Sequence, residues 1–160
     1  MKKIASIISA LTLCIGAYSE INAQSKEKVP YYYEMISNPD KTIDYAFGVY
    51  PTRSEYVRNS NGGGYTKMRV AVINYSKQDL KWNDYKVYIL LKNGDLFYNY
   101  TTAAKEGELA CNYVVKPNET HIQYVCFEKD FDVNQIEKVY LSLLDNKFFP
   151  LLYSDGSDTK

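Results

Sequence analysis

Two runs of alternating apolar side chains, separated by a short polar break, constrain the fold more than any other feature of this sequence. The first run, Tyr65–Tyr75, places Met68, Val70 and Val72 on one face of an extended chain. The second run, Trp82–Leu91, places on one face Tyr85, Val87, Ile89 and Leu91. A period of two is typical of a strand with one buried face. The two runs therefore predict a pair of central strands in a β-sandwich.

Similar alternation recurs along the chain at regular spacing. Further runs lie at residues 42–50, 96–101, 109–115, 120–127 and 136–144, with a short last run at 147–153. Turn residues separate them, including Asn93-Gly94, which tolerates the positive φ of a tight hairpin, and the Pro117 turn. We therefore predict one all-β domain at 42–153, an antiparallel sandwich of seven or eight short strands.

Three segments lack this alternation and are predicted to be linkers, loops or tails. Residues 24–41 begin polar and contain two prolines, so we interpret them as an N-terminal linker. Pro51 is expected to end the strand at 42–50, because proline cannot donate to a strand ladder. Residues 52–64 then form a long loop that ends in three glycines. Residues 154–160 are predicted to be a polar tail.

The amino terminus has the organisation of a secretory signal peptide. Lys2 and Lys3 precede the apolar run Ile4–Ala17, and a polar stretch follows up to Ala23. We expect residues 1–23 to be cleaved and the mature protein to be exported, to the periplasm or the extracellular space. The apolar run is short for a membrane span and the later ones are shorter, so the mature chain is expected to have none. Lipid attachment at Cys14 is an alternative, which the bulky preceding leucine disfavours.

Charge and cysteine content narrow the classes of function. The chain carries 19 Lys and Arg against 19 Asp and Glu, so no charge excess directs it to nucleic acid or an anionic membrane. Cys111 and Cys126 stay after the signal is removed, and export predicts a disulfide between them. In the predicted strand at 120–127, Ile122, Tyr124 and Cys126 share the apolar face. Two cysteines and His121 are too few for a zinc site, so no metal or cofactor is expected.

Tyrosine is the unusual component of the composition, at 17 residues. Its side chain suits a half-buried strand, so many tyrosines are expected in the core and rim, among them Tyr45, Tyr85, Tyr113 and Tyr124. Tyrosine is also enriched in binding surfaces. Aromatic residues on the opposite face or near strand edges therefore form a candidate binding surface, which consists of Trp82, Tyr88, Tyr98, Tyr100 and Tyr140.

Four short pieces resemble parts of the small immunoglobulin-like domains of secreted bacterial antigens and lipoproteins. They are MRVAVINYSKQDL, LLKNGDLF, VVKPNETHIQYVCFE and IEKVYLSLL, which lie within residues 68–144, a stretch of about half of the mature chain. In such domains the first piece is a strand that leaves through an Asn-containing turn, and the third runs from a Pro or Gly turn into a strand ending in Phe. The sequence departs from this pattern at Asn118, where a glycine often follows the turn proline. The resemblance implies an immunoglobulin-like sandwich whose relatives mostly have no assigned activity or are thought to bind or be displayed.

No pattern of catalytic residues accompanies the predicted strands. The sequence has no Gly-x-Ser-x-Gly motif, and His121 beside the Pro117 turn is interpreted as a surface histidine. We therefore predict a non-catalytic binding or interaction module at the bacterial cell envelope. It would engage a protein or a glycan through exposed aromatic residues and the loop at 52–64. The alternative is a secreted inhibitor or immunity-type protein that blocks an enzyme's active site with a loop.

Overall fold

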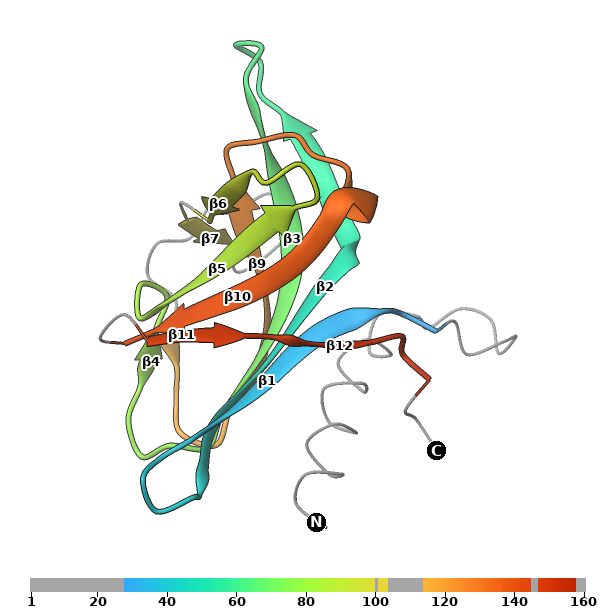
Figure 1. The fold of residues 1–160 in the computed structure, drawn as a ribbon. Helices are drawn as coiled ribbons and strands as arrows, with labels where there is room; N and C mark the ends of the chain where they lie inside the picture. Colours follow the sequence, from blue (N-terminus) through green and yellow to red (C-terminus); the bar gives the residue numbers. More distant parts are fainter. Residues whose placement is uncertain (1–27, 100, 104–113, 145–146, 158–160) are drawn as a thin grey trace, which may run out of the picture.

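The computed structural model describes residues 28–99, 101–103, 114–144 and 147–157. Within these ranges the regular structure is antiparallel β apart from one short 3-10 helix, η1, at Val133–Gln135 (Figure 1). The strands are β1 (Tyr31–Ser37), β2 (Ile43–Arg58), β3 (Gly64–Asn74), β4 (Leu80–Lys81), β5 (Tyr85–Leu91), β6 (Leu96–Tyr98), β7 (Thr101–Ala103), β8 (Val114–Val115), β9 (Thr120–Phe127), β10 (Ile136–Leu143), β11 (Lys147–Pro150) and β12 (Leu152–Ser154). None of the described residues form a helix long and apolar enough to cross a membrane.

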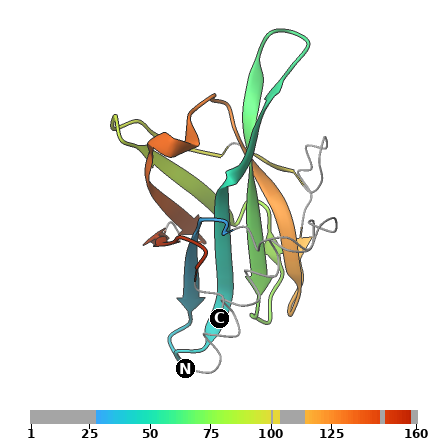
Figure 2. The same ribbon diagram turned by 90° about the vertical axis from the view of Figure 1, so that its right-hand side faces the viewer.

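The strands form two main sheets that pack face to face (Figure 2). One sheet has the order β12-β1-β2-β3-β9-β7 and the other the order β11-β10-β5-β6. In the lettering of immunoglobulin domains, β2-β3-β9-β7 correspond to strands A, B, E and D, and β11-β10-β5-β6 to strands G, F, C and C′. We call them the ABED sheet and the GFCC′ sheet. The predicted immunoglobulin-like sandwich is confirmed, with β1 and β12 added at the A edge and β4 paired with β8 in a small ribbon.

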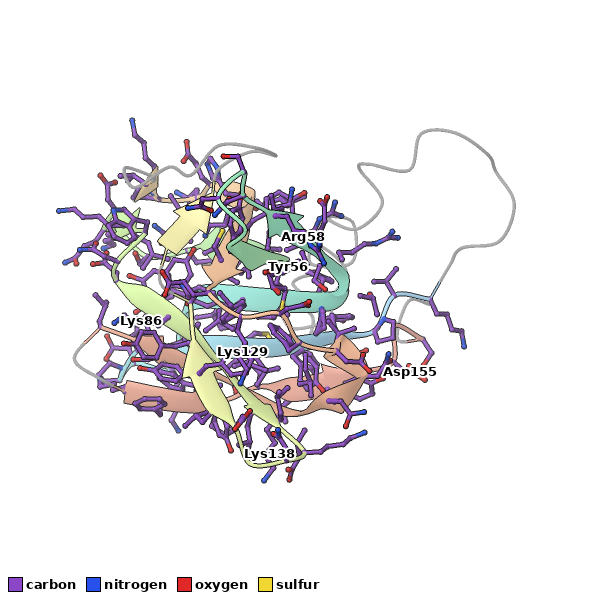
Figure 3. All side chains as sticks on the ribbon, turned by 90° about the horizontal axis from the view of Figure 1, so that it is seen from above. Tyr56, Arg58, Lys86, Lys129, Lys138 and Asp155 are labelled. Carbon is purple, nitrogen blue, oxygen red and sulfur yellow. The ribbon has the colours of Figure 1, made fainter. Side chains whose placement is uncertain are left out.

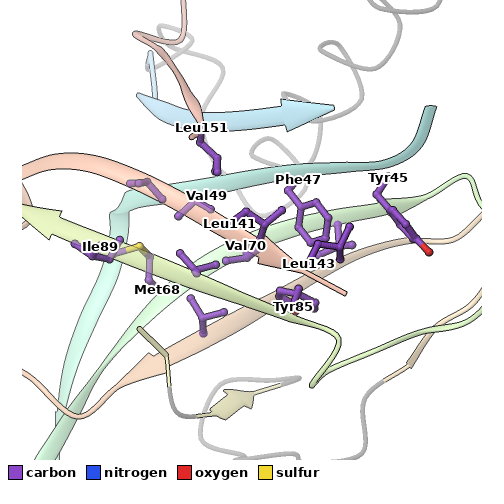
Figure 4. Close-up of a cluster of buried hydrophobic side chains, with 14 of the residues drawn as sticks. Tyr45, Phe47, Val49, Met68, Val70, Tyr85, Ile89, Leu141, Leu143 and Leu151 are labelled. Atoms are coloured by element: carbon purple, nitrogen blue, oxygen red, sulfur yellow. The ribbon is translucent and has the colours of Figure 1, made fainter. Parts of the chain in front are cut away.

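The core lies between the two sheets and follows most of the predicted parities (Figure 4). The ABED sheet contributes Phe47, Val49, Met68, Val70 and Val72, and the GFCC′ sheet contributes Tyr85, Val87, Ile89, Val139, Leu141 and Leu143. Across the interface, the ring centroids of Phe47 and Tyr85 lie 5.2 Å apart. Burying each large apolar side chain contributes roughly 1.5–3 kcal/mol, so these rows fix how the sheets face each other.

The parity predicted for β9 is wrong. Its core side carries Gln123, Val125 and Phe127, whereas its outer side carries Ile122, Tyr124 and Cys126. Gln123 takes a core position because its amide nitrogen donates a hydrogen bond to the hydroxyl of Tyr85 on the opposite sheet. On the outer side, Cys126 packs in a small separate cluster with Tyr65.

The sandwich extends beyond both predicted boundaries, because the two ends of the described chain pair with each other. β1 lies inside the predicted linker at 24–41, yet it pairs with both β2 and β12. Tyr31 is 1% exposed, and its ladder partner Ser154, the first residue of the predicted tail, is also buried. The run of three tyrosines at 31–33 is thus a strand, in keeping with the high β propensity of tyrosine.

The predicted loop at 52–64 is a β-hairpin that extends away from the body of the sandwich (Figures 1 and 2). β2 continues through Pro51 to Arg58, and β3 begins at Gly64 after a turn in which Asn59 donates its main-chain N–H to the Gly63 carbonyl. Pro51 does not end the strand, because the ladder register shifts between Tyr50 and Ser54 and leaves the proline in an unpaired bulge. We call residues 54–65 the hairpin arm.

Candidate interaction surface

The outer face of the GFCC′ sheet brings together most of the predicted binding surface. Tyr98, Tyr88 and Tyr140 stand side by side in one row across β6, β5 and β10. The row on one side of them consists of Leu96, Leu90 and Lys138, and the row on the other side of Lys86, Ser142 and Phe148. Directly opposed side chains in an antiparallel pair lie roughly 5 Å apart. We call Tyr88, Tyr98, Tyr140 and Phe148, with Leu90 and Leu96, the aromatic face.

Tyr88 is at the centre of this face and holds its neighbours by ring contacts. Its ring centroid lies 5.2 Å from that of Tyr98 at an interplanar angle of 43°, and 4.9 Å from that of Phe148 at 57°. Tilted aromatic pairs of this kind contribute about 0.5–1.5 kcal/mol beyond the area that they bury. The outer members stay open to solvent, with Tyr98 50% exposed, Phe148 55% and Leu96 59%. The cluster is thus held in place and still presents large apolar surfaces.

The charged side chains on the same face are lysines. The Lys86 ammonium nitrogen lies 4.7 Å from the centroid of the Tyr98 ring, within the range of a cation–π contact. The nearby carboxylates already have partners: Asp84 accepts a hydrogen bond from the main-chain N–H of Lys81, and Asp95 is 2.8 Å from the Lys129 ammonium nitrogen. The hydrogen bond from Lys129 lowers the pKa of the Asp95 carboxyl group.

An open hollow of about 320 Å³ adjoins the aromatic face. Its lining consists of Asn83, Asp84, Tyr85, Lys86, Tyr88, Ser142 and Leu144. Polar groups dominate this lining, which also includes the buried Tyr85. The hollow has room for a side chain of a bound partner beside the ring of Tyr88.

Two residues of the predicted binding surface are not part of this cluster. Trp82 is half-buried in the turn between β4 and β5, and Tyr100 lies outside the described residues. Conversely, the aromatic face includes Phe148 and Leu96, which strand parity did not nominate. Phe148 was obscured because Pro150 breaks the alternation of its short strand; its position follows from pairing with Ser142.

The predicted disulfide stays a prediction. Cys126 is buried, and Cys111 lies outside the described residues. Burial raises the pKa of Cys126 to about 11, and the neighbouring Lys67 opposes this shift only in part. The thiol is therefore neutral at physiological pH, which makes it a poor nucleophile.

Other tyrosines have a structural role on the outer side of the ABED sheet. The rings of Tyr31 and Tyr50 stack with centroids 5.5 Å apart, and Tyr50 lies across Gly48, where a Cβ atom would come within 2.8 Å of its hydroxyl oxygen. Both side chains are buried in a cluster with small neighbours such as Ala46 and Ala71. The high tyrosine content is thus divided between packing and exposed surface.

His121, interpreted from the sequence as a surface histidine, contacts Glu119 at the turn before β9. Its Nε2 atom lies 3.0 Å from a carboxylate oxygen of Glu119, at the start of β9. Burial lowers the pKa of His121. Over the described ranges, no group of three or more His, Cys, Asp or Glu side chains is placed to hold a metal ion.

Comparison with known proteins adds a structural similarity and no family. No family model matches the chain, and no curated protein matches it. Among solved structures, the chain is similar to an uncharacterized β-sandwich protein from Clostridium difficile 630, with a TM-score of 0.47 and 16% sequence identity. The similarity covers 73% of this chain and 87% of that protein.

Proposed function

We propose that this protein is a non-catalytic binding module of the bacterial cell envelope that engages another protein through the aromatic face. The observation that carries the proposal is the aromatic cluster on the outer face of the GFCC′ sheet, in which Tyr98 and Phe148 are exposed and Tyr88 and Tyr140 are half-buried. Exposed apolar patches rimmed by polar residues typically mark interaction sites, and aromatic residues are enriched in protein interfaces. The signal-like residues 1–23 support an exported location.

Ring geometry favours a protein partner over a glycan. A sugar stacks best on an open, flat ring face, but the neighbouring rings here are tilted by 43° and 57° to Tyr88 and form no common plane. The Lys86 ammonium group also lies over one face of the Tyr98 ring. Side chains of a protein can insert between tilted rings and fill the hollow beside Tyr88, and such aromatic anchors dominate the energetics of many protein interfaces.

The alternative, an inhibitor that inserts a loop into an enzyme, has one specific observation in its favour. The hairpin arm extends from the sandwich and ends in an exposed tip at residues 59–63 (Figure 1). Within the arm the Tyr56 side chain packs against Gly64, where a Cβ atom would come within 2.6 Å of the Tyr56 hydroxyl oxygen. A projecting hairpin is a suitable shape for blocking an active site.

Capture from an envelope extract, with the mature chain of residues 24–160 as bait and a glycan array in parallel, tests the proposal. We expect a protein to bind, and Tyr98→Ala and Phe148→Ala each to weaken its affinity about 30-fold, the loss typical of a hot-spot residue. Tyr75→Ala, at an exposed tyrosine outside the aromatic face, is the matched control and should bind normally.

The outcomes separate the two functions. Binding that survives the paired change Tyr98→Ala and Phe148→Ala, but is lost when the tip at 59–63 is shortened, would favour the inhibitor. Array hits without a captured protein would move the proposal to glycans. Equal melting temperatures for all variants would show that a loss of binding is not a loss of fold.

A further inference from the structure

We propose that the partner surface bound by the aromatic face is acidic: a protein segment whose carboxylates meet Lys86 and Lys138. This inference rests on the proposed function and deepens it by naming the chemistry of the partner. A segment with aliphatic or aromatic side chains for the tyrosine row, and Asp or Glu on both sides of them, would fit the face.

The strand register places the two lysines on opposite sides of the tyrosine row. Along β5 and β10, Lys86 lies opposite Ser142, Tyr88 opposite Tyr140, and Leu90 opposite Lys138. The two lysine positions are four residues apart along the strands, which corresponds to roughly 14 Å. Figure 3 shows Lys86 and Lys138 at separate places on this side of the molecule. A bound segment that crosses the tyrosines would therefore meet a positive charge before and after them.

The charge of the face is unbalanced. In its three cross-strand rows, Lys86 and Lys138 are the charged residues, and no carboxylate stands among the described members. Neither lysine forms an ion pair within the described ranges, and Asp95 at the margin is already paired with Lys129. Asp84 lines the hollow beside Lys86, outside the three rows; it accepts a hydrogen bond from the main-chain N–H of Lys81 and forms no ion pair with Lys86. Glu137 is exposed at the bulge that precedes Lys138, outside these rows. An acidic partner would supply the missing counter-charges.

A second copy of the chain does not fit this face as well. In a two-fold interface each copy presents the same patch, so Lys86 and Lys138 would occur twice and meet no carboxylate from the rows. Placing like charges together in an interface is strongly unfavourable, and it suppresses wrong partners. An anionic membrane is also a weak candidate, because stable electrostatic attachment requires a cluster of basic residues and this face has two.

Selection from a random peptide display library on the mature protein tests the inference. The leading peptides are then synthesised, and their affinities are measured for the wild type, the double variant Lys86→Glu/Lys138→Glu and Tyr98→Ala. Lys77→Glu, at an exposed lysine in the turn after β3, is the matched charge control.

We expect the selected peptides to be enriched in Asp and Glu relative to the library. The double charge reversal should weaken their binding at least tenfold at about 0.01 M salt, and the difference should shrink at about 1 M salt, where the Debye length falls to about 3 Å. Lys77→Glu should leave the affinity within twofold of the wild type.

Two results would overturn the inference in different ways. Neutral or basic peptides that are lost with Tyr98→Ala, but keep their affinity in the double charge reversal, would refute the acidic partner and leave the proposed function intact. If the selected peptides bind Tyr98→Ala and the double charge reversal as tightly as the wild type, or if no peptide is enriched, the result would count against the aromatic face as a binding surface.

Discussion

A buried hydrogen bond between Gln123 and Tyr85 joins the two sheets, and its removal tests how much it contributes to stability. Gln123 comes from β9 of the ABED sheet and Tyr85 from β5 of the GFCC′ sheet, and both side chains are buried. The Gln123 amide nitrogen donates to the Tyr85 hydroxyl oxygen. The amide oxygen of Gln123 is buried and has no hydrogen-bond partner in the described structure. The contact is thus the main polar compensation for a buried amide.

Tyr85→Phe removes this compensation and leaves the whole Gln123 amide buried without a partner. Such a change costs about 1–3 kcal/mol, so we predict a fall of about 2 kcal/mol in the free energy of unfolding. Replacing both partners by apolar groups of similar shape is nearly neutral by the same reasoning. The double variant Tyr85→Phe/Gln123→Leu should therefore recover at least about 1 kcal/mol relative to the sum of the single changes.

Urea unfolding followed by the fluorescence of Trp82, the single tryptophan, measures these free energies. Tyr98→Phe, which removes a hydroxyl from an exposed tyrosine, is the control and should change stability by less than about 0.5 kcal/mol. Single-variant costs that simply add, or a cost of Tyr85→Phe no larger than that of the control, would refute the reasoning.

Three further predictions follow from buried or crowded groups. Burial raises the pKa of Tyr85, and its hydrogen bond with Gln123 opposes this shift in part, so Tyr85 ionises at a lower pH in the unfolded state than in the folded state. The free energy of unfolding is therefore constant with respect to this group below about pH 10 and falls as the pH rises above it. Tyr85→Phe should reduce this fall by up to roughly 1.4 kcal/mol per pH unit, as measured by urea unfolding at alkaline pH. Gly64→Ala should cost about 1–3 kcal/mol, because its Cβ atom would lie 2.5 Å from the Val57 carbonyl oxygen, whereas Gly63→Ala, with its nearest such atom at 3.6 Å, should cost less in thermal melts. In reduced protein, Cys126 should react with a thiol reagent at neutral pH only after unfolding; fast reaction in the native state would contradict its burial.

Strand positions and most side-chain parities could be predicted because unbroken alternation marks them. β3, β5 and β10 each carry three or more apolar residues at every second position, and those residues form the core. The prediction of which face of β9 points inward was wrong, because Gln123 occupies a core position while Cys126 faces outward. The reason is a hydrogen bond to Tyr85 on another sheet, which no local pattern in the sequence contains.

The ends of the domain could not be predicted, because they depend on contacts between distant parts of the chain. Tyr31 pairs with Ser154, so the strand character of each segment depends on the other. Pro51 is tolerated because the ladder with β3 shifts register at that point, which is a property of the pair and not of the proline. The expectation that proline ends a strand considers one strand alone, and it therefore led to the wrong prediction of a loop at the hairpin arm.

The candidate surface was partly predictable, because strand alternation indicates which side chains share a face but not which strands lie side by side. Parity nominated Tyr88, Tyr98 and Tyr140, and the register of three strands then brings them into one row. Trp82 was nominated with them, but it lies in a turn, where alternation does not determine direction. Phe148 joins the face through the pairing of β11 with β10, which the sequence around Pro150 does not display.

Oxidative side-chain footprinting with a bound partner tests the central claim most directly, because tyrosine and phenylalanine side chains report their own solvent exposure. We predict that the partner protects Tyr98 and Phe148 while Tyr75 and Tyr153, which are exposed elsewhere, stay fully labelled. Unchanged labelling of Tyr98 and Phe148, together with protection of Tyr56 in the hairpin arm, would contradict binding through the aromatic face.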